Sequence, residues 1–264
     1  KPGAHTRYYP GEWENNLCRM HMSNSPPDAR RASYDEICKH FSPVFRFFFL
    51  ERFSHSPSLW HEARMSYVRS CAVNSIVGHT LGIGDRHSHN ILVHENTGEV
   101  VHIDFGIVFE QGKVLTIPET VPFRLTRDIV DGMGPNGTEG SFTTAALATT
   151  KVLRENSSAL LTVLSAVVSD PLYKWCVSPI KARQRQRDEQ IPENGDDESI
   201  CSESTSTTNK TARINPVLSI LAENENDAAT RTIAKINEKL SGYEDGTLGE
   251  RQTVEGQVRL LINA

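Results

Sequence analysis

The 264-residue sequence has few of the features that place a protein directly in a structural or functional class. It has five cysteines, an odd number, and no Cys-x-x-Cys pair among them. An odd number of widely spaced cysteines does not indicate a disulfide scaffold, so we expect reduced thiols in a reducing compartment. The formal net charge is −5. A global basic field that would attract nucleic acid or an anionic membrane is therefore missing, and we expect neither as a direct partner.

Long apolar runs are also missing. The longest, "ALLTVLSAVV" at 159–168, contains Thr162 and Ser165. It has about half of the roughly 20 apolar residues that a membrane-spanning helix requires. The sequence starts with Lys-Pro-Gly and shows no apolar stretch of the kind found in signal peptides, so we predict no secretory signal.

Helical patterns dominate the first third of the chain. The opening residues 1–16 are rich in Pro, Gly and aromatics and predict an irregular segment. Ser33 with Glu36 forms a capping-box pattern, which predicts a short helix that ends near Pro43. The apolar run at 43–53 predicts a buried helix.

A long helix is predicted from Ser56-Pro57, where Ser is a cap and Pro occupies the first turn. The helix should end at Gly82, because Gly82-Ile83-Gly84 is unfavourable for helix. Apolar residues recur at helical spacing between these points. They are Trp60, Ala63, Tyr67, Cys71 and Ile76.

Two short apolar runs, 90–93 and 99–103, predict a β-hairpin, with Gly98 available for a positive φ in the turn. A long loop should follow to about Thr126. Further helices are predicted at 127–133, 143–154 and 158–168. The expected fold is mainly α with one small β-hairpin.

The C-terminal part changes in composition. Residues 185–226 are polar and Ser/Thr-rich, which predicts a disordered linker, because such a segment buries too little apolar surface to offset its ordering entropy. A helix is predicted at 227–241, within a segment 227–247. The terminal segment 248–264 contains "VEGQVRLLINA", which places Val254, Val258 and Leu261 on one helical stripe.

The stretch "LGIGDRHSHNILVHENTGEVVHIDFG" at 81–106 has the densest chemistry. Phosphoryl transfer requires a group that orients or deprotonates the attacking hydroxyl, and oxygen ligands that hold magnesium against the nucleotide phosphates. Asp85 and Asn90 have the spacing of the base and the metal ligand in the protein-kinase catalytic loop. Asp104 opens Asp-Phe-Gly, and the hairpin should bring it beside Asn90. The sequence therefore predicts a kinase site.

The order Asp85-Arg86-His87 narrows the family. "GDRHSHN" and "HIDFG" resemble the phosphatidylinositol 3-kinase superfamily. "PETVPFRLTRDIVDGMG" at 118–134 and "GTEGSF" at 137–142 resemble the phosphatidylinositol 3-kinase-related protein kinases. The end of the chain resembles the start of that family's C-terminal FATC domain. The resemblance covers roughly 1–180 and 227–264.

This resemblance implies a role for each matching residue. Asp85 would be the catalytic residue that accepts or orients the hydroxyl proton, and His87 would act beside it. Asn90 and Asp104 would hold Mg²⁺ or Mn²⁺ with ATP, and residues 106–126 would form the activation loop. For Arg86, we expect an ion pair that braces the loop rather than a contact with substrate.

Two alternatives remain open for the site. Asp85, His87 and His89 alternate in a pattern that could bind a transition metal. A lipid kinase would use the same catalytic loop, but it should attract an anionic headgroup with a basic cluster. The expected activation loop has only Lys113 and Arg124 against two glutamates, which favours a protein hydroxyl as acceptor.

A kinase also needs a glycine-rich loop and a lysine on the phosphates. No such pattern precedes residue 81. We therefore expect residues 1–184 to be the C-lobe of a bilobal phosphatidylinositol 3-/4-kinase-like catalytic domain without its N-lobe, in a fragment of a longer protein that is inactive alone. The alternative is a short, catalytically inactive scaffold or interaction module.

The resemblance also implies a biological setting. It implies a serine/threonine protein kinase of the DNA-damage response in the nucleus, which phosphorylates protein substrates at Ser or Thr followed by Gln. It further implies DNA-damage sensor proteins as partners, a part in telomere maintenance and the cell cycle, and a homodimeric full-length protein.

Overall fold

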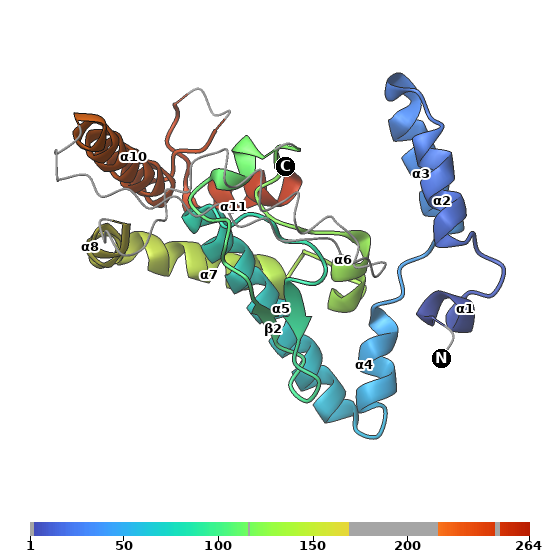
Figure 1. Ribbon diagram of the computed structural model, residues 1–264. Helices are drawn as coiled ribbons and strands as arrows, with labels where there is room; N and C mark the ends of the chain where they lie inside the picture. The colour runs from blue at the N-terminus through green and yellow to red at the C-terminus, as the bar shows by residue number, and fades with distance from the viewer. Residues whose placement is uncertain (1–2, 116, 169–215, 246–248) are drawn as a thin grey trace, which may run out of the picture. The chain divides into compact units, whose positions relative to one another are not determined.

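The computed structural model describes residues 3–115, 117–168, 216–245 and 249–264, and side chains in all of these except 216–228. The chain forms two compact units, each built from several segments. The first comprises Lys1–Ser75, Ile91–His102 and Arg124–Ala146, and the second comprises Ile76–Asn90, Ile103–Phe123 and Leu147–Ala264. The predicted class, mainly helical with one antiparallel hairpin, is confirmed (Figure 1).

The first unit contains short helices, most of one long helix and the hairpin. Its elements are α1 (Ala4–Tyr8), α2 (Asn15–Ser23), the 3₁₀ helix η1 (Pro27–Ala29), α3 (Arg30–His40), α4 (Arg46–Phe53), α5 (Pro57–Leu81) up to Ser75, β1 (Ile91–Val93), β2 (Val100–His102), α6 (Arg127–Met133) and the start of α7 (Ser141–Glu155).

Helix α5 has the predicted bounds. Pro57 is its first residue, and the Leu59 N–H lies 3.4 Å from the Ser56 hydroxyl oxygen. The helix ends at Gly82, whose φ of +62° is accessible to glycine at little cost. Four of the five residues on the predicted apolar stripe are buried. They are Ala63, Tyr67, Cys71 and Ile76.

The predicted hairpin is confirmed, with Leu92 opposite Val101 in the register of β1 and β2. Gly98 in the turn has φ of +75°, and a Cβ there would lie 2.5 Å from the Ala63 carbonyl oxygen. The hairpin lies along α5 (Figure 1), where the Val100 N–H donates to the Ser70 hydroxyl at 2.8 Å. The pairing of the two strands and this hydrogen bond to α5 therefore fix the positions of the two ends of the hairpin.

Aromatic side chains form the core of the first unit. Phe45, Phe48, Phe49 and Phe53 come from α4 and the residue before it, and their rings contact one another and Tyr67 of α5. Phe49 is only 1% exposed. The Tyr67 hydroxyl donates to the Ile129 carbonyl at 2.9 Å, which satisfies its polar end. The prediction of a buried helix near 43–53 is confirmed, although α4 begins only at Arg46.

Two predictions for the N-terminal part were wrong. Residues 1–16, expected to be irregular, contain α1 and the start of α2. Tyr8 stacks on Phe47 with ring centroids 3.7 Å apart, so tertiary packing supports a helix that the local composition does not favour. Ser33 is no cap, because α3 begins at Arg30, and its hydroxyl accepts a hydrogen bond from Ser25 at 2.6 Å.

The second unit contains the end of α5, the segments that precede and follow the hairpin, and the C-terminal helices. Its further elements are the 3₁₀ helix η2 (Gln111–Val114), the rest of α7, α8 (Ser157–Val168), α10 (Pro216–Ser241) and α11 (Val254–Asn263). Helix α10 packs against α8. The helices predicted at 127–133, 143–154 and 158–168 correspond to α6, α7 and α8 and are confirmed.

The predicted linker is only partly described. Residues 185–215 lie outside the described residues, whereas 216–226 belong to α10. The helix expected from 227 therefore begins earlier, at Pro216, a residue suited to the first helical position. Helix α11 has the expected stripe, with Val258 and Leu261 buried, and Thr253 caps it by accepting from the Gly256 N–H at 3.0 Å.

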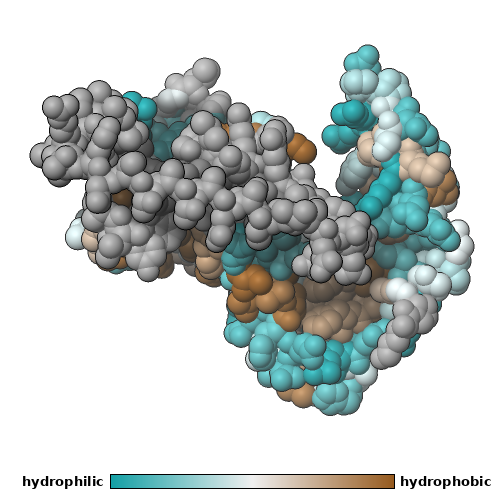
Figure 2. All heavy atoms as spheres, viewed as in Figure 1, coloured by the Kyte–Doolittle hydropathy of each residue, from teal (hydrophilic) through white to brown (hydrophobic). Residues whose placement is uncertain are grey.

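Figure 2 shows hydrophobic surface, in brown, among the hydrophilic teal where α4, α5 and the hairpin lie. Leu50 of α4, Leu92 of β1 and Val101 of β2 are among the exposed apolar residues. Among the described residues, no helix combines the length and the apolar character that crossing a membrane would require.

Candidate active site

The candidate site begins where α5 ends and contains strained backbone. Among the described residues, four non-glycine positions have positive φ: Asp85 at +56°, Asp104 at +57°, Phe109 at +56° and Glu110 at +65°. This conformation costs about 1–3 kcal/mol each and persists only where surrounding contacts impose it. Two of the four are the aspartates that the sequence singled out, so the strain lies at the predicted chemistry.

Asn90 is held between the two aspartates along the chain. It is 6% exposed, and its Nδ2 donates to the Asp85 carbonyl at 2.9 Å. The main-chain carbonyl of Asn90 accepts from the N–H of Ile103 at 3.1 Å, and Ile103 directly precedes Asp104. Because the amide nitrogen is occupied, Oδ1 is the atom of Asn90 suited to hold a cation.

His87 is close to Asp85. Its Nε2 lies 3.9 Å from the Asp85 carboxylate, and the ring is 47% exposed. Its Nδ1 accepts from the His89 N–H at 3.2 Å, which assigns the proton of a neutral ring to Nε2. His87 therefore presents a donor on the side of the Asp85 carboxylate.

Asp104 has one carboxylate oxygen fixed by its own turn. Oδ1 accepts from the Gly106 N–H at 3.1 Å, which leaves Oδ2 as a hard oxygen ligand. Asp85, His87, Asn90 and Asp104 all belong to the second unit.

Arg86 braces this arrangement through carbonyl groups. Its guanidinium donates to the carbonyls of Gly84 at 2.9 Å and Ile103 at 2.7 Å, and also to that of Asp104. Burial lowers the pKa of Arg86, although the carboxylates of Asp85 and Asp104 act in the opposite direction. The sequence predicted a brace made by an ion pair. The hydrogen bonds of Arg86 instead go to main-chain oxygens, so this side chain joins the segment before β1 to the segment after β2.

Glu119 was missed as a site residue. Its Oε1 accepts from the Asp85 N–H at 2.7 Å. Burial raises the pKa of Glu119. The hydrogen bond from the Asp85 N–H opposes this rise, whereas the nearby Asp85 charge adds to it. The sequence analysis counted Glu119 only as a charge of the activation loop. No local spacing could have found it, because its partner lies 34 residues away.

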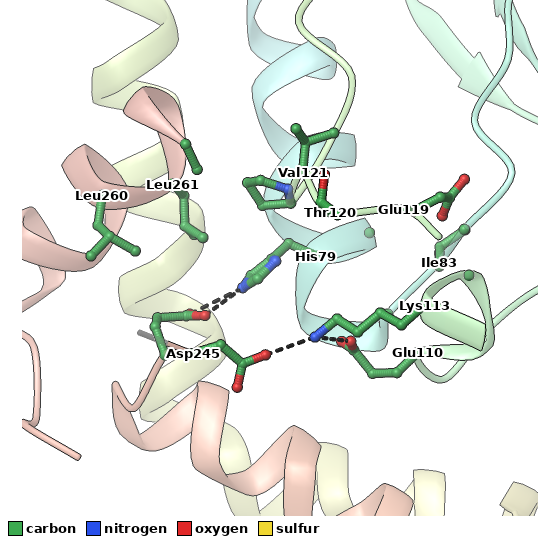
Figure 3. Close-up of a pocket in the computed structure, with 17 residues that line it drawn as sticks. His79, Ile83, Glu110, Lys113, Glu119, Thr120, Val121, Asp245, Leu260 and Leu261 are labelled. Atoms are coloured by element: carbon green, nitrogen blue, oxygen red, sulfur yellow. Dashed lines mark hydrogen bonds and ion pairs between the residues drawn. The ribbon is translucent and has the colours of Figure 1, made fainter. Parts of the chain in front are cut away.

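A second polar cluster lies at the pocket that Glu119 also lines (Figure 3). The Lys113 amine lies between two carboxylates, 2.5 Å from Glu110 and 2.7 Å from Asp245. Lys239 of α10 is 4% exposed, contacts Glu110 and donates to the His79 carbonyl at 2.6 Å. These contacts fix the left-handed Glu110 between the end of α5 and α10.

Helix α11 is joined to the same cluster. The His79 ring lies 2.9 Å from Glu244, and Gln257 donates to the other Glu244 oxygen at 2.5 Å. Burial would raise the pKa of Glu244, but the hydrogen bonds from His79 and Gln257 and the nearby positive charges lower it. A cavity of about 150 Å³ lies beside these groups, and its lining includes Gly84, Glu119 and Leu261.

The transition-metal alternative was tested against the geometry. Among the described residues, no group of three or more His, Cys, Asp and Glu side chains is arranged to hold a metal ion. The side-chain oxygens of Asn90 and Asp104 are hard donors of the type that divalent cations such as magnesium bind, together with water and phosphate.

A family model of phosphatidylinositol 3- and 4-kinase matches residues 6–177. The chain belongs to this kinase family. Among its relatives, the serine/threonine-protein kinase ATM of Arabidopsis thaliana is 44% identical over 260 residues, which are 98% of this chain and 6% of that protein. The kinase-family chain thus spans less than a tenth of the length of the curated relatives it matches.

Two solved structures resemble the fold of this kinase-family chain. The structure titled "FAT and kinase domain of CtTel1" matches with a TM-score of 0.73 and 38% identity, over 98% of this chain and 15% of that one. A "Tel1 kinase butterfly symmetric dimer" matches with a TM-score of 0.72 and 34% identity, over 98% of this chain and 9% of that one. The predicted kinase-like fold class is therefore confirmed.

Proposed function

We propose that this chain is the C-terminal part of the catalytic domain of a serine/threonine protein kinase that uses ATP with Mg²⁺ or Mn²⁺. The observation that carries the proposal is the braced Asp85–Asn90–Asp104 arrangement, in which Arg86 donates to the Ile103 and Asp104 carbonyls and the Asn90 carbonyl accepts from the Ile103 N–H. Membership of the kinase family and the name of the Arabidopsis thaliana relative support it.

In the proposed mechanism, Asp85 receives or orients the proton of the acceptor hydroxyl. The Nε2 of His87 lies 3.9 Å from the Asp85 carboxylate, beyond hydrogen-bond distance, so its N–H can donate to a phosphate oxygen beside that group. Asn90 Oδ1 and Asp104 Oδ2 would hold the metal, which when bound neutralises charge on the phosphates. The chain's own residues thus orient the hydroxyl and position the metal.

A protein acceptor is favoured over a lipid. A phosphoinositide headgroup would require free basic side chains on the activation loop. Lys113, one of its two cations, is already paired with Glu110 and Asp245. We infer that the acceptor is the hydroxyl of a Ser or Thr residue that is followed by Gln, as the resemblance to the phosphatidylinositol 3-kinase-related protein kinases implies.

The wider biology is part of the same proposal. Relatives named ATM and Tel1 support a role in DNA-damage signalling and at telomeres, with nuclear localisation and sensor proteins as partners. The solved dimer of a Tel1 kinase supports a homodimer. The division into C-lobe, linker and FATC segment remains a prediction.

The experiment uses the protein at the full length of its relatives. Asp85→Ala and Asp104→Ala should each reduce phosphate transfer to a Ser-Gln peptide by at least 10³-fold, with Glu139→Ala, at an exposed site, as the control. Retained transfer in either aspartate variant would contradict the assignment. Phosphorylation of a phosphoinositide instead of the peptide would favour the lipid kinase.

The alternative of an inactive scaffold is tested with the 264-residue chain. If it is only an interaction module, the purified chain should not bind Mg²⁺-ATP, and neither Asp104→Ala nor Asn90→Ala should change that result. Micromolar binding that either substitution weakens would instead show that the phosphate half of a nucleotide site is present in these residues.

A further inference from the structure

Glu119 makes a contact that the proposed mechanism does not use. Its Oε1 accepts from the main-chain N–H of Asp85 at 2.7 Å. Asp85 has positive φ and lies between α5 and β1, outside both, so its N–H has no partner in a helix or strand ladder. The carboxylate therefore satisfies a main-chain donor that the loop would otherwise leave without a protein partner.

The surrounding glycines leave room for this carboxylate. A Cβ at Gly84 would lie 2.6 Å from Glu119 Oε2, and a Cβ at Gly112 would also collide with that oxygen. The Glu119 N–H donates to the Gly112 carbonyl at 3.1 Å, which fixes the backbone from which the side chain extends. The absence of side chains at Gly84 and Gly112 leaves space for the Glu119 carboxylate. The main-chain hydrogen bond from Glu119 to Gly112 helps to hold it against the loop that contains Asp85.

The opposite side of Asp85 is held by different groups. Asn90 donates to the Asp85 carbonyl, whereas Glu119 accepts from the Asp85 N–H. Each therefore restrains one of the two peptide groups that flank the Asp85 Cα. Restraint on both sides fixes φ and ψ of this residue and so the direction of its carboxylate.

We propose that Glu119 is a positioning residue, which holds the left-handed Asp85 backbone so that its carboxylate faces the acceptor hydroxyl. This inference rests on the proposed kinase function. It assigns Glu119 no contact with substrate, because its effect is transmitted through the main chain of Asp85.

The kinetic test uses the full-length protein and a Ser-Gln peptide. Glu119→Ala should reduce kcat about 10- to 100-fold with less than a threefold change in KM for ATP. Glu119→Gln keeps an acceptor oxygen at the same reach, so it should restore kcat to within about threefold of the unsubstituted protein. Glu139→Ala, the exposed control, should leave both constants unchanged.

A second measurement does not depend on activity. In the 264-residue chain, hydrogen–deuterium exchange of peptides covering 83–90 should be faster in Glu119→Ala than in the parent chain. Glu119→Gln and Glu139→Ala should keep the parent rate. Peptides from the hairpin, 91–102, serve as an internal reference whose exchange should not change.

The outcomes separate the two proposals. If the parent protein transfers no phosphate but Glu119→Ala still accelerates exchange at 83–90, the kinase function fails and the restraint on Asp85 remains. If the parent is active and Glu119→Ala changes neither kcat nor exchange, the positioning role is refuted. Equal kcat losses in Glu119→Ala and Glu119→Gln would also refute it, because the charge rather than the acceptor would then matter.

Discussion

Different kinds of interaction stabilise the interiors of the two units of this chain. The first unit centres on aromatic rings, with Phe45, Phe49 and Tyr67 in mutual contact. The second unit contains a chain of charged and amide groups, in which Lys239 and Glu244 are almost inaccessible to solvent. Aromatic burial is favourable with little dependence on direction, whereas buried charges are stable only with partners in defined positions.

This difference matches where the candidate chemistry lies. The residues predicted to be catalytic and the left-handed backbone belong to the second unit, together with the polar network. Hydrogen bonds are directional, so they can fix the angle of a loop such as the one after Asp104, whereas the burial of apolar groups has no preferred direction. We infer that the first unit contributes more of the stability and the second more of the geometry.

The largest expected effect comes from the aromatic core. Phe49→Ala should lower the free energy of unfolding of the first unit by about 3–5 kcal/mol, because a fully buried ring is replaced by a cavity. Urea unfolding followed by the fluorescence of Trp13 and Trp60, with Trp175→Phe in the background, would report on this unit. Leu50→Ala, on the same helix but exposed, is the matched control and should cost less than about 1 kcal/mol.

A smaller effect is expected from the buried charge network. Lys239→Ala removes the partner of Glu110 and of the His79 carbonyl, and should destabilise the second unit by about 2–4 kcal/mol. Lys113 stays beside Glu110 and limits the loss. Far-UV circular dichroism during urea unfolding is the measurement, and Lys235→Ala, on the same helix but more exposed, is the control. Equal effects of both lysine variants would contradict the importance of burial.

Acid should weaken the second unit more than the first. Burial raises the pKa of Glu110 and Glu244, but their cationic and hydrogen-bonding partners lower it overall. A carboxyl whose folded pKa is depressed stabilises the fold above its unfolded pKa of about 4.3, and this stabilisation is lost as pH falls through the folded value. Melting followed by circular dichroism between pH 7 and pH 3 should show the loss.

The control for the acid prediction is Glu244→Gln. The variant cannot titrate at this position, so the stability of its second unit should depend less steeply on pH below about 4.5. Tryptophan fluorescence of the first unit should change less over the same range. An equal loss in both units would remove the proposed difference between them.

The features that could be predicted from sequence are those with local causes. Pro57 and Gly82 mark both ends of α5, and Gly98 marks the hairpin turn. The spacing of Asp85, Asn90 and Asp104 predicted a shared site, and these residues do belong to one unit. Their roles as base and metal ligands remain predictions.

What could not be predicted depends on contacts between distant segments. The Asp85–Glu119 bond joins residues 34 apart, and the Lys239–Glu110 contact joins residues 129 apart. Helix α1 was missed because its support comes from rings such as Phe47 rather than from its own sequence. The sequence shows that such residues are polar or aromatic, but it does not show which distant residues they contact.

The smallest expected effect comes from a charge pair that is exposed. Lys151 and Glu155 lie at i and i+4 on α7, in the second unit, with 3.8 Å between amine and carboxylate and most of both side chains in solvent. The order Lys before Glu is the weaker one on a helix, and salt screens such pairs. Lys151→Ala should therefore change the free energy of unfolding by less than about 0.5 kcal/mol in the urea experiment. A loss as large as that of Lys239→Ala would mean that the number of ion pairs, and not their burial, distinguishes the second unit.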